Sequence, residues 1–188
     1  MEKKYYHGSS DLNLKELTPR ISTHGIAWVY ATTNPVLAAF FSARLNDFSV
    51  ITEIDQNQVV NVWELYEGAF NEKCKGKKTA LYELEDSGFL SNQTSFKAEV
   101  VSPNKTRIIS TLIIDDIGKY LKQKSEEGLI KIHFYENTPK YQAMVKEHIC
   151  DRLVRFNMME RPREMLPDVV KQHWIKFYDE LKSNIKGK

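Results

Sequence analysis

Three polar residues that lie far apart in the sequence, His7, Tyr30 and Glu99, each fall within or at the end of a predicted β-strand. His7 follows two strand-forming tyrosines and precedes Gly8 and two serines, a composition that favours a turn. Histidine changes its charge near neutral pH, and strand ends often present such groups for chemistry. Each of the three residues also has an ordinary structural explanation, so it is their combination that indicates a site.

Several sequence signatures of common active sites are missing. The chain has no glycine-rich phosphate loop, no HExxH zinc helix and no Gly-x-Ser-x-Gly nucleophile turn. Cys74 and Cys150 lie far apart, without a cysteine or histidine pair at ligand spacing. We therefore expect no metal site and no disulfide framework, and two isolated cysteines are typical of a reducing compartment.

The composition is that of a soluble globular fold. The chain has 188 residues, of which 41% are hydrophobic and 28% are charged. This length and composition are sufficient to form a hydrophobic core without disulfide bonds or structural metals. A net charge of +2 is too small to indicate nucleic acid or a membrane surface by itself, and nucleic acid stays open as a partner. No apolar run approaches the ~20 residues of a membrane span, and no signal peptide is recognisable. We expect a cytoplasmic protein, with signal-peptide-independent export left open.

The elements that must position the three residues are mixed. Residues 26–32 are rich in strand-forming types, and the following helix is capped by Thr33 or Asn34 and begins with Pro35. Strands are also predicted at 50–54, 59–66, 79–85, 94–102, 106–115 and 129–135. We expect 106–115 to be well buried because its apolar run is nearly continuous. These patterns predict an α+β fold.

A short helix is predicted from Asp115 or Asp116 to Gly128, before the last predicted strand. The last quarter of the chain, which follows that strand, is predicted to contain helices alone. Thr138-Pro139 then opens a helix with one apolar stripe, and a second striped helix follows the breaks at Pro162 and Pro167. We predict a main domain over residues 1–136 and a helical extension over 137–188.

Three stretches together resemble the ADP-ribosyltransferase superfamily, particularly its diphtheria-toxin-like branch and small bacterial members such as rifampin ADP-ribosyltransferase. They are YYHGSS, VYATTNPVLAAFFSA and FKAEVVSP, and the resemblance covers residues 4 to 115. It implies split antiparallel β-sheets with an early helix, followed here by the C-terminal helical extension. In that superfamily a histidine, a tyrosine and an acidic residue occur in this order on three strands.

The resemblance implies a set of site residues. Glu99 would be the catalytic acid, with Glu83 as the second choice among Glu64, Glu83 and Glu85. Phe41 stands where the branch places a second tyrosine, and it keeps the ring but lacks the hydroxyl. Lys97 occupies the position where arginine-modifying members have glutamate or glutamine, so arginine is not a favoured acceptor. The residues implied to bind NAD are His7, Gly8, Ser9, Tyr30, Thr32 and Phe41.

The implied reaction explains these residue types. Cleavage of the bond between nicotinamide and ribose in NAD develops positive charge on the sugar, which the Glu99 carboxylate would stabilise. Tyr30 and Phe41 could stack on the nicotinamide ring, Gly8 would let backbone groups approach its carboxamide, and His7 would bond a ribose hydroxyl. NAD is the substrate, and no metal is required.

Other residues and other functions stay open at this stage. Arg20 and Arg44 could meet the pyrophosphate of NAD, and His24 could line the same cleft. The acceptor of ADP-ribose is unidentified: a protein, a small molecule, nucleic acid or water, the last making the protein an NAD glycohydrolase. Alternatively, the chain is a non-catalytic module that retains the fold and binds a partner through its C-terminal helices, where basic residues outnumber acidic ones.

Overall fold

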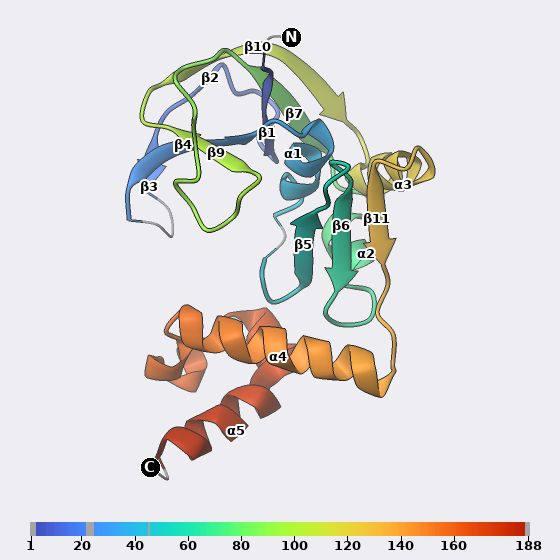
Figure 1. Ribbon diagram of the computed structural model, residues 1–188, viewed down its shortest axis with the longest axis vertical. Helices are drawn as coiled ribbons and strands as arrows, with labels where there is room; N and C mark the ends of the chain where they lie inside the picture. Colours follow the sequence, from blue (N-terminus) through green and yellow to red (C-terminus); the bar gives the residue numbers. More distant parts are fainter. Residues whose placement is uncertain (1–2, 22–24, 45, 187–188) are drawn as a thin grey trace. The chain divides into compact units, whose positions relative to one another are not determined.

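The computed structural model describes residues 3–21, 25–44 and 46–186 and has a mixed α+β architecture, as expected from the sequence (Figure 1). The helices are α1 (Pro35–Phe41), α2 (Ala69–Cys74), α3 (Ile117–Glu126), α4 (Pro139–Arg155) and α5 (Ile175–Lys186). The strands are β1 (Tyr5–Ser9), β2 (Glu16–Leu17), β3 (Arg20–Ile21), β4 (Ala27–Thr32), β5 (Val50–Ile54), β6 (Val60–Glu64), β7 (Thr79–Leu84), β8 (Leu90–Ser91), β9 (Glu99–Ser102), β10 (Thr106–Ile114) and β11 (Ile130–His133). None of the described helices is both long enough and apolar enough to cross a membrane.

The larger of two sheets carries the strands that sequence analysis singled out. Its strand order is β2-β10-β7-β1-β4-β9-β8, with β3 paired to β4, and the paired strands run antiparallel. The smaller sheet has the order β11-β6-β5. Antiparallel sheets were expected, and strands β1, β4 and β9 are consecutive neighbours in the larger one.

The chain divides into two compact units. The first unit comprises the described parts of 1–45, 52–62 and 71–132, and the second comprises those of 46–51, 63–70 and 133–188. The second unit therefore contains the C-terminal helices together with two short segments from the middle of the chain. Every residue implied to form the NAD site belongs to the first unit.

Helix α1 begins where the local sequence predicts it. The Asn34 side chain accepts hydrogen bonds from the backbone N–H groups of Val36 and Leu37, both at 3.0 Å, and Pro35 occupies the first turn. This satisfies two of the donors that a helix start leaves without partners. Residues 36–40 are buried, and α1 packs against β1, β4 and β7 of the sheet and against α3.

Strand β10 differs from expectation, because its apolar run is largely exposed. The exposed fractions of Ile109, Leu112 and Ile113 are 61%, 50% and 40%. The prediction that 106–115 is well buried was wrong, since β2 pairs only with Thr106 and Arg107. Beyond these two residues, β7 is the one strand that pairs with β10 within the described part of the chain.

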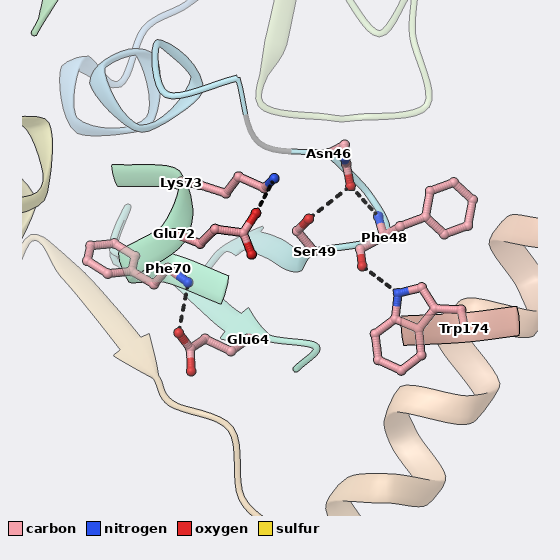
Figure 2. Close-up of polar contacts among 8 residues, drawn as sticks. All are labelled: Asn46, Phe48, Ser49, Glu64, Phe70, Glu72, Lys73 and Trp174. Carbon is pink, nitrogen blue, oxygen red and sulfur yellow. Dashed lines mark hydrogen bonds and ion pairs between the residues drawn. The ribbon is translucent and has the colours of Figure 1, made fainter. Parts of the chain in front are cut away.

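The second unit has its own aromatic core and internal polar contacts. Phe48, Tyr66, Trp174 and Tyr178 pack there with buried aliphatic residues of α4. The Trp174 ring N–H donates to the Phe48 carbonyl at 2.8 Å, as Figure 2 shows. The predicted start of α4 is confirmed, since the Thr138 hydroxyl accepts from a backbone N–H of the first turn.

Candidate functional site

His7, Tyr30 and Glu99 lie on three neighbouring strands of the larger sheet. In the register, Tyr6 pairs with Thr32 and Thr32 pairs with Glu99, so one cross-strand row connects β1, β4 and β9. The three residues come from segments well separated in sequence, and each lies in this row or within two positions of it. The fold therefore brings the three sequence motifs together.

The side chains of the three residues are divided between the two faces of the sheet. Alternation along β1 places His7 on the same face as Tyr5, a core residue of the first unit. The register places Tyr30 and Glu99 on the opposite face, with Gly8. That face is the one on which α1 packs, because a Cβ atom at Gly8 would meet Ala38 of α1.

The His7 ring bridges β1 and β4 where these strands separate. Across the described residues, the β1–β4 ladder has the single pair Tyr6–Thr32. Beyond it, His7 Nδ1 lies 2.8 Å from the Tyr30 carbonyl oxygen. Since a carbonyl only accepts, Nδ1 carries the proton, and Nε2 of the neutral ring is then an acceptor. Burial lowers the pKa of His7, the Tyr30 carbonyl opposes this, and the Arg20 charge lowers the pKa further, which favours the neutral ring.

A cavity of about 220 Å³ lies beside His7 and contains both charged and apolar groups. Arg20 and Arg44, which sequence analysis connected with a pyrophosphate, both line it. Sequence analysis missed the two carboxylates on its wall, Asp11 and Glu16. The lining residues are His7, Ser9, Asp11, Leu14, Glu16, Leu17, Thr18, Arg20, Trp28, Val29, Tyr30 and Arg44. Typical cofactor sites occupy roughly 300–1,000 Å³, so this cavity is smaller than a complete site of that kind.

Gly8, Ser9 and Thr32 each have a local structural role. A Cβ atom at Gly8 would lie 1.8 Å from the Ala38 carbonyl oxygen, so only glycine lets α1 approach β1 this closely. The Ser9 hydroxyl accepts from the Asp11 N–H at 3.1 Å. The Thr32 hydroxyl is buried and accepts from the Asn34 N–H at 3.2 Å, next to the start of α1. These contacts shape the ends of β1 and β4.

Phe41 and Glu99 each contact Phe96, and none of these three residues lines the cavity. The Phe41 ring is partly exposed and meets the Phe96 ring edge-on, with the ring centroids 5.8 Å apart. The Glu99 N–H donates to the Phe96 carbonyl at 3.0 Å. Sequence analysis missed Phe96 because it placed this residue in a strand. In the structure β9 begins only at Glu99, and Phe96 belongs to the preceding loop.

The three other acidic residues considered for the catalytic role each contact other groups of the chain. Glu83 accepts from Lys4 at 2.8 Å and from the Ser110 hydroxyl at 3.2 Å, and the Lys4 contact lowers the pKa of Glu83. Glu85 lies 3.8 Å from Arg107 on the surface. Glu64 is buried in the second unit and accepts the Phe70 N–H at 2.8 Å (Figure 2) and the Tyr135 N–H at 3.0 Å. His24 lies outside the described residues.

Comparison with known proteins adds no family to these observations. No protein-family model matches the chain, and no curated protein or solved structure matches it. Within the described part of the chain, no three His, Cys, Asp or Glu side chains are grouped so that they could hold a metal ion. The functional argument therefore rests on the residues around β1, β4 and β9.

Proposed function

We propose that the protein is an NAD-dependent ADP-ribosyltransferase, with the fold of that superfamily, which transfers ADP-ribose from NAD to an acceptor and releases nicotinamide. One observation carries this proposal. The strands that bear His7, Tyr30 and Glu99 are consecutive neighbours, and the first two separate beside a cavity that contains two arginines. A dinucleotide needs both features: space between strands for its riboses and phosphates, and cations beside the phosphates.

Each proposed role follows from the position of the residue. His7 uses Nδ1 on the Tyr30 carbonyl, so Nε2 accepts a hydroxyl of an NAD ribose. Arg20 and Arg44 meet the pyrophosphate, because guanidinium groups match phosphate geometry. Nicotinamide lies on the α1 side of the sheet, where Tyr30 and Phe41 offer aromatic surfaces.

Glu99 is the proposed charge-stabilising group. The bond between the ribose carbon and the nicotinamide nitrogen breaks, and nicotinamide leaves as a neutral molecule with the bonding electrons. The acceptor forms the new bond to the same carbon and loses its proton. A fixed carboxylate beside the ribose favours the transition state, in which positive charge develops on the sugar.

The decisive experiment measures nicotinamide release from NAD by the purified chain and by two matched variants. We expect release by the parent and by Glu83→Gln, and loss of release in Glu99→Gln with folding unchanged by circular dichroism. Loss in Glu83→Gln alone would overturn the assignment of Glu99. If NAD carries a label on its adenosine, transfer to an acceptor is distinguished from hydrolysis, which yields free ADP-ribose.

The position of Glu99 outside the cavity lining favours a second candidate, a module that retains the fold without cleaving NAD. In that case NAD or a partner binds and no nicotinamide appears with any acceptor class. Calorimetric titration of NAD into the parent separates the two cases, because the enzyme both binds and cleaves. Binding without release would support the module, and release that depends on Glu99 would overturn it.

A further inference from the structure

Tyr82, in the middle of β7, is a buried tyrosine to which the proposed function assigns no role. It lies directly opposite His7 in the ladder between β1 and β7. Opposed residues of an antiparallel pair share a face of the sheet, so both side chains lie on the same face. Tyr82 exposes 0% of its surface and packs in the core of the first unit with Tyr5 and Leu17. A side chain without exposed surface does not contact a ligand, and it acts through its neighbours.

The Tyr82 hydroxyl bonds two backbone groups of the loop between β1 and β2. It donates to the Asp11 carbonyl oxygen at 2.6 Å and accepts the Leu14 N–H at 3.2 Å. A phenol has a single proton to donate, and here that proton goes to the loop while the oxygen accepts from the same loop. The segment from Asp11 to Leu14 is thereby held at both of its ends by one side chain of a distant strand.

The two residues that Tyr82 holds, Asp11 and Leu14, both line the cavity between β1 and β4. Two further hydrogen bonds of this loop are local. The Asp11 N–H donates to the Ser9 hydroxyl at 3.1 Å, and the Asp11 carboxylate accepts the Asn13 N–H at 3.0 Å. These bonds join residues two positions apart and shape the loop, whereas the bonds to Tyr82 fix the position of the loop on the sheet. The wall of the cavity therefore depends on a hydroxyl that lies behind it.

We propose that Tyr82 is a positioning residue of the NAD site, whose hydroxyl fixes the wall formed by Asp11 and Leu14 and thereby raises the affinity for NAD. This inference rests on the proposed function, because NAD is the ligand proposed for the cavity. A wall that is fixed before the ligand arrives need not be ordered on binding, so the cost of ordering does not reduce the affinity. Tyr82 lies on the face opposite to Glu99, so the chemical step should not depend on it.

The first test compares Tyr82→Phe with Tyr141→Phe, a matched control in the second unit. Each change removes one hydroxyl that bonds the backbone, since the Tyr141 hydroxyl donates to the Glu64 carbonyl at 2.8 Å, so both variants should be less stable. We expect Tyr82→Phe to raise the dissociation constant of NAD about tenfold, measured by calorimetric titration, because binding must then order the loop. Nicotinamide release at saturating NAD should be unchanged. Tyr141→Phe should retain the NAD affinity of the parent, and equal affinities in the two variants would contradict the inference.

The second test examines the loop without NAD, by amide hydrogen exchange measured with NMR. The Leu14 amide should exchange about tenfold faster in Tyr82→Phe than in the parent, because it loses its acceptor. The Val36 amide, which donates to the Asn34 side chain at 3.0 Å, should exchange equally in both proteins. Unchanged exchange at Leu14, or NAD affinity equal to that of the parent, would overturn this inference alone. A parent that does not bind NAD, with Leu14 protected, would overturn the proposed function and this inference with it.

Discussion

Glu64 and Trp174 in the second unit and His7 in the first unit differ in how completely their polar atoms are satisfied by the chain itself. In the second unit, both carboxylate oxygens of Glu64 accept backbone N–H groups, and the Trp174 ring N–H and the Tyr141 hydroxyl donate to backbone carbonyls. In the first unit, His7 uses one ring nitrogen on Tyr30 beside a cavity lined by charges of both signs.

This difference separates structural polar groups from candidate functional ones. A buried polar group whose hydrogen bonds all go to the chain's own backbone fixes local structure, and its loss is expected to change stability. A partly satisfied group beside a charged cavity is suited to bind a ligand, and its loss is expected to change binding. The predictions below test this distinction.

The largest effect is expected where the first unit is most closely packed. Gly8→Ala places a Cβ atom 1.8 Å from the Ala38 carbonyl oxygen, so α1 must move off β1. We expect a loss of at least about 3 kcal/mol in the free energy of unfolding, as for severe overpacking, measured by urea titration. Gly128→Ala is the control, since its positive φ of 76° is strained but no atom lies within 4 Å. It should cost about 1–2 kcal/mol, and equal losses would contradict the close approach of α1.

The next effect lies in the second unit. Glu64→Gln keeps one acceptor oxygen but turns an amide N–H₂ toward the N–H of either Phe70 or Tyr135. We expect the free energy of unfolding to fall by about 1–3 kcal/mol, the cost of leaving a buried donor without a partner. Glu53→Gln, on the exposed part of β5, should cost less than about 0.5 kcal/mol. Nicotinamide release per folded molecule should be unchanged, and a selective loss of release would mean that Glu64 is functional.

Signals that act over a few residues predicted local structure correctly. Features that depend on segments distant in the sequence could be seen only in the folded structure. Asn34 and Pro35 act within one helical turn, so the start of α1 could be predicted. The burial of β10 could not, because it depends on how far β2 extends along it. Alternation along β6 gave no reason to separate Glu64 from Glu99, since its two donors are the N–H of Phe70, after the following turn, and the N–H of Tyr135, in a distant segment. Sequence analysis explained Gly8 by the close approach of a ligand. In the structure, α1 is the neighbour whose close approach requires glycine at this position.

A smaller effect should separate binding from stability at the cavity. Arg20→Gln removes a cation from the cavity while keeping a polar side chain on exposed strand β3. We expect NAD to bind about tenfold more weakly, in line with the loss of a charge-assisted hydrogen bond, measured by calorimetric titration. Stability should change by less than about 0.5 kcal/mol, as for other surface substitutions. Arg107→Gln, at the far side of the sheet, is the matched control and should leave NAD affinity unchanged.

The smallest effect concerns one histidine in each unit. Burial lowers the pKa of His7, and it also lowers the pKa of His148, whose Nε2 lies 3.1 Å from the Asp47 carbonyl oxygen. As the pH falls below the ordinary value of 6.5, the unfolded chain binds a proton that the folded chain resists. Each histidine therefore makes the protein less stable on acidification, and the stability returns as the pH rises. His7→Gln and His148→Gln should each flatten the dependence of the unfolding free energy on pH as the pH falls below the ordinary value of 6.5.

Saturating NAD distinguishes the two histidines. If His7 Nε2 accepts a ribose hydroxyl, protonation of the ring removes that acceptor, so NAD should bind more weakly at low pH. The pH dependence of unfolding should then become steeper in the presence of NAD, because the ligand favours neutral His7. His148→Gln should retain this change, and His7→Gln should lose it. An NAD-dependent change that survives in His7→Gln would place the ligand elsewhere and remove the functional contrast between the two units.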